Sequence, residues 1–237
     1  MIKSISDREN YFEVLTCQIV SLIKNKQKIK MSKRDGNFVT LNDVYSNVGK
    51  DPIRYYMIST RNETAIDFDL DEVINRAIEN GVTQLICVGT DINSSEKAIQ
   101  IAENYSEVFA TTGVHPHDAE KADKKYVQIL EDLAKHEKVV AIGEMGLDYF
   151  YDFSDRKVQK TIFRDQLDLA KDLELPAVIH NRDSDEDLLQ TIIESKLNHG
   201  VIHCFASDYQ MAEKLLKIGL HISFTGMVTF VKSLHEV

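Results

Sequence analysis

The sequence predicts an α/β protein whose larger part is an incomplete TIM-barrel-like (β/α) domain, preceded by a small, mostly helical N-terminal segment. From about residue 72, short apolar runs rich in β-branched residues alternate with stretches of helical periodicity. Polar residues stand at the carboxyl ends of several of these runs. A closed barrel of this type needs eight strands in roughly 250 residues, whereas this pattern supplies six strands in 166 residues.

The six expected strands cover residues 84–90, 108–114, 139–146, 177–181, 200–205 and 221–226. The expected helices cover residues 94–104, 124–136, 156–173, 184–195 and 210–218. Because a helix separates each strand from the next, the strands are expected to be parallel, with their carboxyl ends on one face.

The first 70 residues do not continue this alternation. Residues 12–24 read as a helix, residues 24–34 as a basic loop, and residues 41–60 as a helix interrupted near Pro52. We therefore expect two domains, with residues 1–70 forming one and residues 71–237 the other.

Charge also separates the two parts. Residues 1–70 carry 11 Lys or Arg and 9 Asp or Glu, a net charge of +2, whereas the remainder has a net charge of −12 within a total of −10. This balance argues against broad nonspecific affinity for nucleic acid, although a metal ion can still handle a phosphate ester locally.

The cysteines and the apolar runs favour a cytoplasmic protein. Cys17, Cys87 and Cys204 are widely spaced and form no Cys-x-x-Cys pair, as is typical of a reducing compartment. No run approaches the roughly 20 apolar residues of a membrane span. The first residues lack the apolar stretch of a secretion signal.

Glu144, His180 and His203 are the candidate metal ligands. Each stands at the carboxyl end of an expected buried strand, in the runs VVAIGE, AVIH and VIH. These ends are expected to meet on one face, where one carboxylate and two imidazoles would form a partial site for a divalent ion. A single His after a strand is more often a hydrogen-bonded or surface residue, but three such residues at equivalent strand ends favour a site.

Residues 71–237 resemble the TatD family of metal-dependent hydrolases. The resemblance rests on five segments in the order and spacing of that family: 112–117 (TGVHPH), 141–149 (AIGEMGLDY), 178–183 (VIHNRD), 202–205 (IHCF) and 222–226 (ISFTG). It implies a (β/α)8 barrel that hydrolyses phosphodiesters in DNA, with ancestry as a 3′ deoxyribonuclease.

The resemblance also implies roles for single residues. Glu144 would be catalytic and bridge two metals, His180 and His203 would bind the second metal, and His115 would contact substrate. The ion would be Mg²⁺, Mn²⁺ or Zn²⁺. The His-x-His pair and the late aspartate of the family have no counterpart in this sequence, so we expect impaired or absent activity.

Four further positions leave alternatives open. Arg182 could hold a substrate phosphate or pair with Asp183 or Asp185. The aromatic residues at 149–151 could stack on an unpaired base or pack within a loop. His117, like His115, could contact substrate. Cys204 is expected to point to the opposite face of its strand from His203 and to serve packing.

Residues 10–70 resemble the KMSK region of arginyl-tRNA synthetase. The matching segments are 30–41 (KMSKRDGNFVTL), 49–57 (GKDPIRYYM) and 67–70 (DFDL). The resemblance implies that Lys30 and Lys33 contact ATP and leaves ATP or tRNA as partners. The alternative is a solvated lysine-rich loop without function.

The two resemblances suggest a fusion of two gene fragments that meet near residues 67–74. This leaves open a third possibility, a fusion product with no selected role. An incomplete barrel would also leave unpaired edges at its first and last strands, and we expect such a chain to be prone to aggregation.

Overall fold

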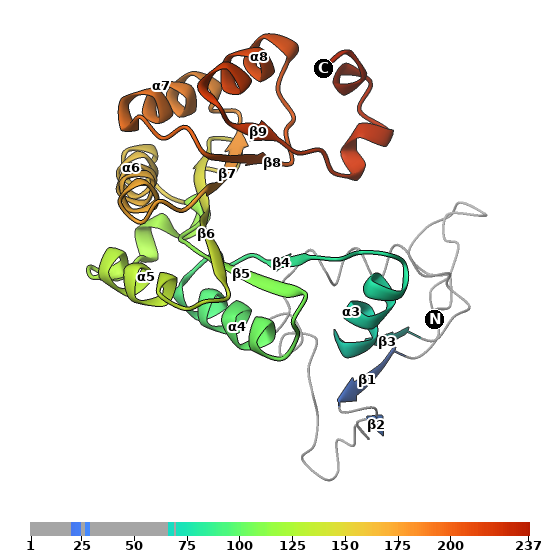
Figure 1. Ribbon diagram of the computed structural model, residues 1–237. Helices are drawn as coiled ribbons and strands as arrows, with labels where there is room; N and C mark the ends of the chain where they lie inside the picture. Colours follow the sequence, from blue (N-terminus) through green and yellow to red (C-terminus); the bar gives the residue numbers. More distant parts are fainter. Residues whose placement is uncertain (1–19, 25–26, 29–65, 69) are drawn as a thin grey trace, which may run out of the picture. The chain divides into compact units, whose positions relative to one another are not determined.

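The computed structural model describes residues 20–24, 27–28, 66–68 and 70–237 (Figure 1). The chain divides into two compact units, Met1–Val82 and Thr83–Val237. This division differs from the expected boundary at residue 70, because a helix that follows the predicted junction belongs to the first unit.

The first unit contains a small sheet in the order β2-β1-β3. Its strands are β1 (Val20–Lys24), β2 (Gln27–Lys28) and β3 (Ile66–Phe68), and helix α3 (Leu70–Glu79) follows. The helix expected over residues 12–24 is wrong for its last five residues, since β1 pairs with β3 in parallel and with β2 in antiparallel. The β-branched residues Val20 and Ile23 suit this strand. Residues 27–28, expected within a basic loop, form β2 instead. The remaining predictions for residues 1–65 lie outside the described residues.

The second unit is built on a six-stranded parallel sheet in the order β4-β5-β6-β7-β8-β9. The strands are β4 (Leu85–Cys87), β5 (Val108–Thr112), β6 (Val139–Asp148), β7 (Ala177–Arg182), β8 (Gly200–His203) and β9 (His221–Ile222). The sheet curves as part of a barrel, with helices on its outer side (Figure 1). The predicted α/β, incomplete TIM-barrel-like fold is confirmed.

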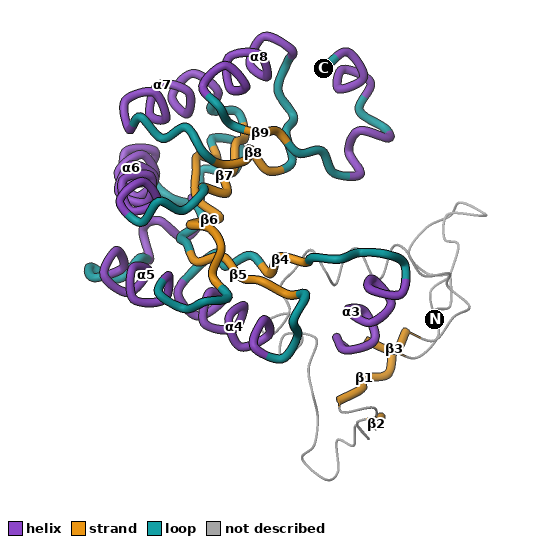
Figure 2. The backbone as a smooth tube through the Cα atoms, in the orientation of Figure 1, coloured by secondary structure: helices purple, strands orange, loops and turns teal. Residues whose placement is uncertain are grey.

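Five helices connect these strands. Figure 2 shows helices in purple and strands in orange. They are α4 (Ile92–Glu103), α5 (Tyr126–Ala134), α6 (Arg156–Asp172), α7 (Asp185–Ser195) and α8 (Tyr209–Ile218). Aspartates begin three of them: the side chains of Asp91, Asp155 and Asp208 accept backbone N–H groups of the first turn. Gly219 ends α8 in a left-handed conformation, with φ +105°.

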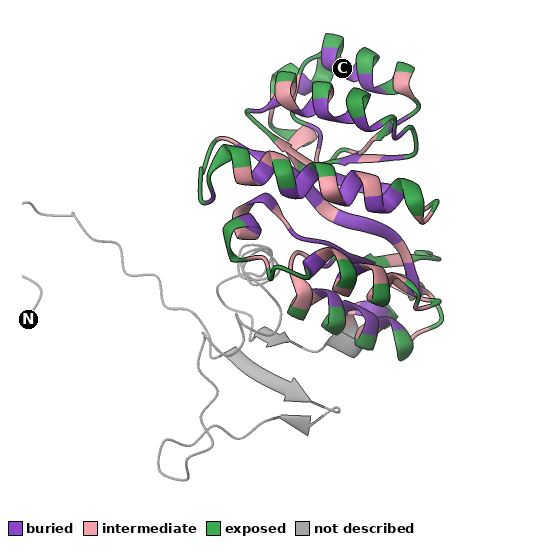
Figure 3. Ribbon diagram, turned by 90° about the vertical axis from the view of Figure 1, so that its left-hand side faces the viewer, coloured by how far each residue is buried: buried purple, intermediate pink, exposed green. Residues whose placement is uncertain are grey.

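The core lies between the sheet and these helices. Phe163 and Leu167 of α6 are fully buried and belong to one cluster with Ile142 and Leu147 of β6 and Ile179 of β7. Figure 3 shows the buried residues along the strands and on one stripe of each helix. Burial of this set stabilises the arrangement that aligns the strand ends.

The elements differ from prediction mainly at their ends. The strand expected over residues 221–226 stops at Ile222, and the strand expected over residues 139–146 continues to Asp148. The short 3-10 helices η1 (Pro116–Lys121), η2 (Gly226–Thr229) and η3 (Lys232–Glu236) were not predicted. Within the described part of the chain, no helix combines the length and apolar character needed to cross a membrane.

Candidate metal centre

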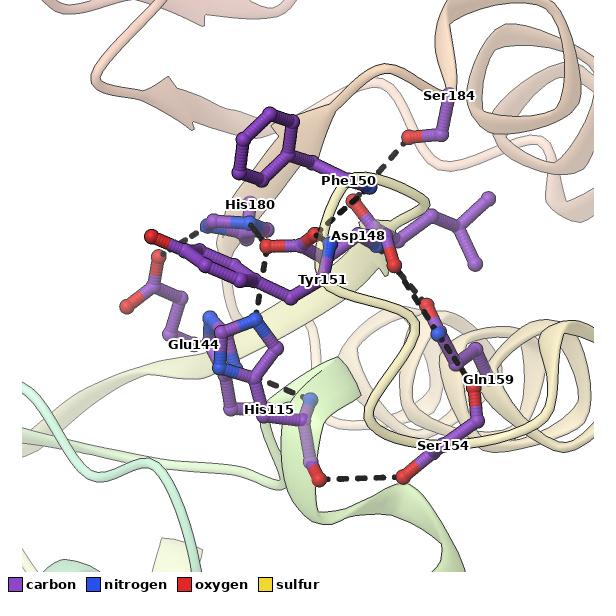
Figure 4. A network of polar contacts seen from close by, with 11 residues as sticks. His115, Glu144, Asp148, Phe150, Tyr151, Ser154, Gln159, His180 and Ser184 are labelled. Carbon is purple, nitrogen blue, oxygen red and sulfur yellow. Dashed lines mark hydrogen bonds and ion pairs between the residues drawn. The ribbon is translucent and has the colours of Figure 1, made fainter.

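The carboxyl ends of three neighbouring strands bring four polar side chains together. β6 supplies Glu144 and Asp148, β7 supplies His180, and the segment after β5 supplies His115. Figure 4 shows these side chains converging. Ligand atoms of His115, Glu144 and His180 all lie within 4.8 Å of one another. The prediction that Glu144 and His180 lie together is therefore confirmed.

His180 joins two carboxylates through its two ring nitrogens. Nδ1 lies 3.2 Å from Oε1 of Glu144, and Nε2 lies 3.1 Å from Oδ2 of Asp148. The Asp148 side chain is almost fully buried, with 1% exposed, and its Oδ1 also accepts the backbone N–H groups of Phe150 and Tyr151 at 3.1 and 2.9 Å. Asp148 thus fixes the ring of His180 from one side and leaves the other side facing Glu144.

The hydrogen bonds among Glu144, His180 and Asp148 favour the charged form of each side chain. Burial by itself lowers the pKa of His180, but its hydrogen bonds to Asp148 and Glu144 outweigh burial and raise the pKa to about 9. Burial raises the pKa of Asp148, yet the hydrogen bonds from His180, the Tyr151 amide and His117 hold it well below its usual range. The pKa of Glu144 is likewise lowered, because the hydrogen bond from His180 and nearby imidazole charges offset its burial.

His115 differs from His180 because it is neutral. Burial, followed by the charge of His180, lowers its pKa to about 4. Its Nδ1 accepts the backbone N–H of His117 at 3.2 Å, so the ring hydrogen of the neutral imidazole lies on Nε2. A ring in this tautomer donates from Nε2 and does not offer a lone pair there. His115 lies within the ligand group by distance, and its contact with substrate stays a prediction.

Asp148 and His117 form a further contact of the centre; no role was predicted for Asp148, and substrate contact was left open for His117. Nε2 of His117 lies 2.8 Å from Oδ2 of Asp148, the same oxygen that His180 contacts. Alternation along β6 was the available signal, since Glu144 and Asp148 are four residues apart and residues at i and i+4 share one face of a strand.

Buried glutamines of α6 hold the strand ends in place. Gln159 accepts the Asp148 N–H at 2.9 Å and donates to the Asp148 carbonyl at 3.1 Å. A second glutamine of the same helix, Gln166, accepts the Val114 N–H at 2.7 Å and donates to the Val114 carbonyl at 3.0 Å. These contacts fix the backbone next to the centre, because a side-chain amide can pair with both groups of one residue.

Gly146 allows β6 to pass close to His180. It has φ +142°, and a Cβ at this position would collide with the carbonyl oxygen of His180. Only glycine readily takes this backbone conformation. Gly146 thus lies between the two carboxylates of β6, Glu144 and Asp148, and lets the backbone of β7 approach β6 closely there.

His203 lies next to His180 in the sheet but outside the close group. The two residues are paired in the register of β7 and β8, and the charge of His203 contributes to the lowered pKa of Glu144. His203 is exposed and is not among the three residues within 4.8 Å. Its role as a ligand stays a prediction. Cys204 Sγ contacts Thr225 Oγ1 at 3.1 Å and Met227 Sδ at 3.6 Å, as expected of a packing residue.

The surroundings of Arg182 and Tyr149 bear on two of the alternatives left open by the sequence. No ion pair joins Arg182 to Asp183 or Asp185 among the described residues; its guanidinium lies over the rings of Phe150 and Tyr151. The hydroxyl of Tyr149 donates to Asp187 at 2.7 Å, and Arg156 covers its ring. Tyr149 therefore serves loop packing. Lys30 and Lys33 lie outside the described residues.

Comparison with known proteins identifies the larger unit. A family described as TatD related DNase matches residues 61–237. The chain belongs to the TatD family. The relatives include the "Uncharacterized metal-dependent hydrolase YabD" of Bacillus subtilis, 40% identical over 171 residues (71% of this chain, 67% of that protein). Another is the "3′-5′ ssDNA/RNA exonuclease TatD" of Cronobacter sakazakii, 40% identical over 164 residues (68% of this chain, 62% of that protein).

Solved structures agree with this membership in the TatD family. The TatD homologue YJJV from Escherichia coli has a TM-score of 0.64 at 32% identity and covers 69% of this chain and 65% of its own. A TatD family hydrolase from Entamoeba histolytica has a TM-score of 0.64 at 33% identity, covering 76% of this chain and 63% of its own. The chain thus spans about two thirds, or slightly less, of the length of these relatives.

The first unit matches a different family. A family described as "tRNA synthetases class I (I, L, M and V)" matches residues 3–69. This match confirms the predicted likeness to a class I synthetase, while the narrower likeness to arginyl-tRNA synthetase stays a prediction. The two matches overlap at residues 61–69, close to the predicted junction.

The donor set of the TatD centre fits a divalent metal ion. Ligand atoms bound at about 2.1 Å to one ion lie roughly 3 to 3.4 Å apart, and Nδ1 of His180 lies 3.2 Å from Oε1 of Glu144. The hydrogen bond from the other ring nitrogen to a carboxylate is the arrangement that orients metal-binding histidines. Carboxylate and imidazole donors suit Zn²⁺, Mn²⁺ and related ions.

Proposed function

We propose that this chain hydrolyses phosphodiester bonds in DNA or a related single-stranded nucleic acid, using a divalent ion held by Glu144, His180 and His203. The observation that supports this proposal most strongly is the Glu144–His180–Asp148 chain, in which two ligand atoms face each other at 3.2 Å while a buried carboxylate holds the opposite ring nitrogen. The names of the relatives, a metal-dependent hydrolase and a ssDNA/RNA exonuclease, support the same reaction class.

Each residue then has a distinct task. A divalent ion supplies Lewis-acid polarisation of the phosphate and activation of the attacking water. Glu144 and His180 would hold this ion, with His203 as the third ligand from the adjacent strand. Asp148 keeps Nε2 of His180 occupied, so that Nδ1 faces the ion. His115 donates its Nε2–H to a nonbridging phosphate oxygen, since its Nδ1 already accepts the His117 amide.

Release of nucleotides from 3′-labelled single-stranded DNA tests the proposal. The assay compares Mn²⁺, Mg²⁺, Zn²⁺ and a chelator, and the wild-type chain with Glu144→Gln and His180→Gln. We expect metal-dependent release that falls in both variants by more than about 100-fold, beyond the roughly 10–100-fold loss typical when a partner of a metal ligand is removed.

Matched controls come from the amino ends of strands in the same sheet. Glu137→Gln changes an exposed carboxylate just before β6, and His199→Gln changes an exposed imidazole just before β8. Both should leave the release rate unchanged. Metal-dependent release that survives equally in Glu144→Gln and Glu137→Gln would refute the proposed site.

A second candidate concerns the synthetase-like segment. Its match to class I synthetases favours a nucleotide-binding remnant in which Lys30 and Lys33 contact ATP. If so, ATP should protect Lys33 from chemical modification, as measured by mass spectrometry. Equal modification with and without ATP would leave no support for that role.

A further inference from the structure

Three exposed aromatic side chains lie beside the metal centre. They are Phe150, Tyr151 and Phe153, with exposed fractions of 56%, 45% and 63%, and we call them the aromatic platform. They stand in the loop between β6 and α6. This loop is tied to the centre, because the N–H groups of Phe150 and Tyr151 donate to Asp148. Figure 4 shows Phe150 and Tyr151 next to His180 and Asp148.

The rings of the platform form a layered surface that begins at the centre. Tyr151 and Phe153 are stacked, with ring centroids 5.2 Å apart and an interplanar angle of 16°. His117, which contacts Asp148, meets both rings edge-on at centroid distances of 5.4 and 4.9 Å. Flat apolar rings that remain this exposed offer a face to another flat, apolar group.

Arg182 adds a positive charge to the platform. Its guanidinium carbon lies 4.0 Å from the ring centroid of Phe150 and 4.6 Å from that of Tyr151. No carboxylate pairs with it in the described part of the chain. The nearby Asp185 instead accepts hydrogen bonds from Asn181 and Ser207, at 2.6 and 2.7 Å. Arg182 is therefore positioned by the rings, with its donors available to an anion.

A hollow that Arg182 helps to line is unfavourable for a polyanion. This hollow has a volume of about 560 Å³, and its lining also includes four acidic residues: Asp183, Asp185, Glu186 and Asp187. The whole chain carries a net charge of −10, so general attraction to phosphates is absent. A nucleic acid that reaches the centre binds most favourably across the platform, because stacking of bases on aromatic rings does not depend on net charge.

We propose that the aromatic platform stacks unpaired bases of a single-stranded substrate while Arg182 contacts the adjoining phosphate. The proposal deepens the proposed function, on which it rests, by assigning the surface that selects single strands. Bases in a duplex are already stacked on one another and cannot lie on protein rings without unpairing, so the platform disfavours duplex substrates.

Stacking can be measured separately from cleavage. A single-stranded oligonucleotide containing 2-aminopurine is titrated with protein in the presence of a chelator, and fluorescence is excited beyond the tyrosine band; the chain contains no Trp. We expect the wild-type chain to quench the probe. Phe153→Ala and Tyr151→Ala should each weaken binding at least about fivefold and reduce quenching, whereas Phe153→Tyr should retain both.

Phe230→Ala is the matched control, since Phe230 is 71% exposed and makes no ring contact with the platform. It should bind and quench as the wild type does. Undiminished quenching in the Tyr151→Ala, Phe153→Ala double variant, or no quenching by the wild-type chain, would overturn the platform.

Metal-dependent cleavage, measured in parallel, distinguishes the two proposals. Quenching that depends on the platform without any cleavage would refute the proposed function and support the platform. Cleavage that is lost in Glu144→Gln but equal for single-stranded and duplex DNA, with unchanged rates in both platform variants, would support the function and overturn the platform.

Discussion

Asp148 is the residue on which most of the centre depends. Its two oxygens accept hydrogen bonds from two imidazoles and two backbone amides, and its side chain has only 1% of its surface exposed. A buried carboxylate is stable only when its lone pairs are satisfied. Asp148 therefore orients His180 and anchors the loop of the aromatic platform at once.

We predict that Asp148→Asn weakens metal binding without removing a ligand. An amide has only one acceptor oxygen, so its NH2 group must replace either the oxygen shared by His117 and His180 or the oxygen that accepts the Phe150 and Tyr151 amides. Either placement sets donor against donor, and His180 loses its fixed orientation. The Mn²⁺ concentration that gives half-maximal activity should rise about 10–100-fold. Asp172→Asn, at an exposed position at the end of α6, is the control; an equal effect in both variants would argue against this role.

Gly146 gives a second prediction at this scale. Gly146→Ala places a Cβ against the His180 carbonyl at φ +142°, and the free energy of unfolding should fall by at least about 2 kcal/mol. Gly226→Ala meets no atom within 4 Å and should change stability by less than about 1 kcal/mol. Urea unfolding measures both. Equal stability of the two variants would contradict the close approach.

The sequence predicts part of this centre and misses the rest for physical reasons. Glu144 and His180 follow from their places at the ends of parallel strands, because such ends meet on one face. Asp148 was missed because the apolar pattern ends the strand at residue 146, whereas β6 continues to Asp148. The tautomer of His115 depends on one hydrogen bond from a backbone amide, and no residue pattern specifies that contact.

At the scale of elements, β6 and α6 form the support of the centre. β6 carries both carboxylates, and α6 covers it with the buried side chains of Phe163 and Leu167. The same helix sends two glutamine side chains to the backbone at the ends of β5 and β6. Helix and strand therefore position the ligands through packing and through paired amide contacts.

Replacing one of these glutamines should destabilise the domain. Gln166→Leu leaves the N–H and carbonyl of Val114 without their partner, and each unpaired buried group costs about 1–3 kcal/mol. We expect a loss of about 2 kcal/mol or more in thermal or urea unfolding. Gln190→Leu, at an exposed position on α7, should change stability by less than about 0.5 kcal/mol. A neutral Gln166→Leu would show that α6 does not hold Val114.

Elements of the larger unit were predictable because their periodicity and their caps agree. The strands are short apolar runs, and Asp91, Asp155 and Asp208 begin three of the helices. β1 was not predictable in the same way, since its partner β3 lies more than 40 residues further along the chain. Short 3-10 helices such as η1 have too few residues to show a period.

At the scale of the whole molecule, the chain divides into two units, and two different families match it, over residues 3–69 and 61–237. The larger unit has a six-stranded sheet whose outer strands, β4 and β9, pair on one side only within the described residues. The side chain of Ile86 in β4 is 54% exposed. The sequence predicted the six strands of this sheet, the likeness of the larger part to the TatD family and the likeness of the first part to a class I synthetase.

The open sheet leads to a prediction for the purified chain. Strands paired on one side only offer unpaired backbone groups to other chains. We expect a broad thermal transition, binding of a hydrophobic dye and association that increases with concentration. Calorimetry, dye fluorescence and light scattering measure these properties. A sharp transition from a monomer that binds no dye would contradict the expectation.

The most direct test of the proposed metal centre is calorimetric titration of the metal-free chain with Mn²⁺. We predict saturable binding that is abolished in Glu144→Gln and His180→Gln but unchanged in Glu137→Gln and His199→Gln, which alter the opposite ends of β6 and β8. Binding that is the same in all five proteins would contradict the assignment of Glu144 and His180 as ligands, and with it the proposed hydrolase.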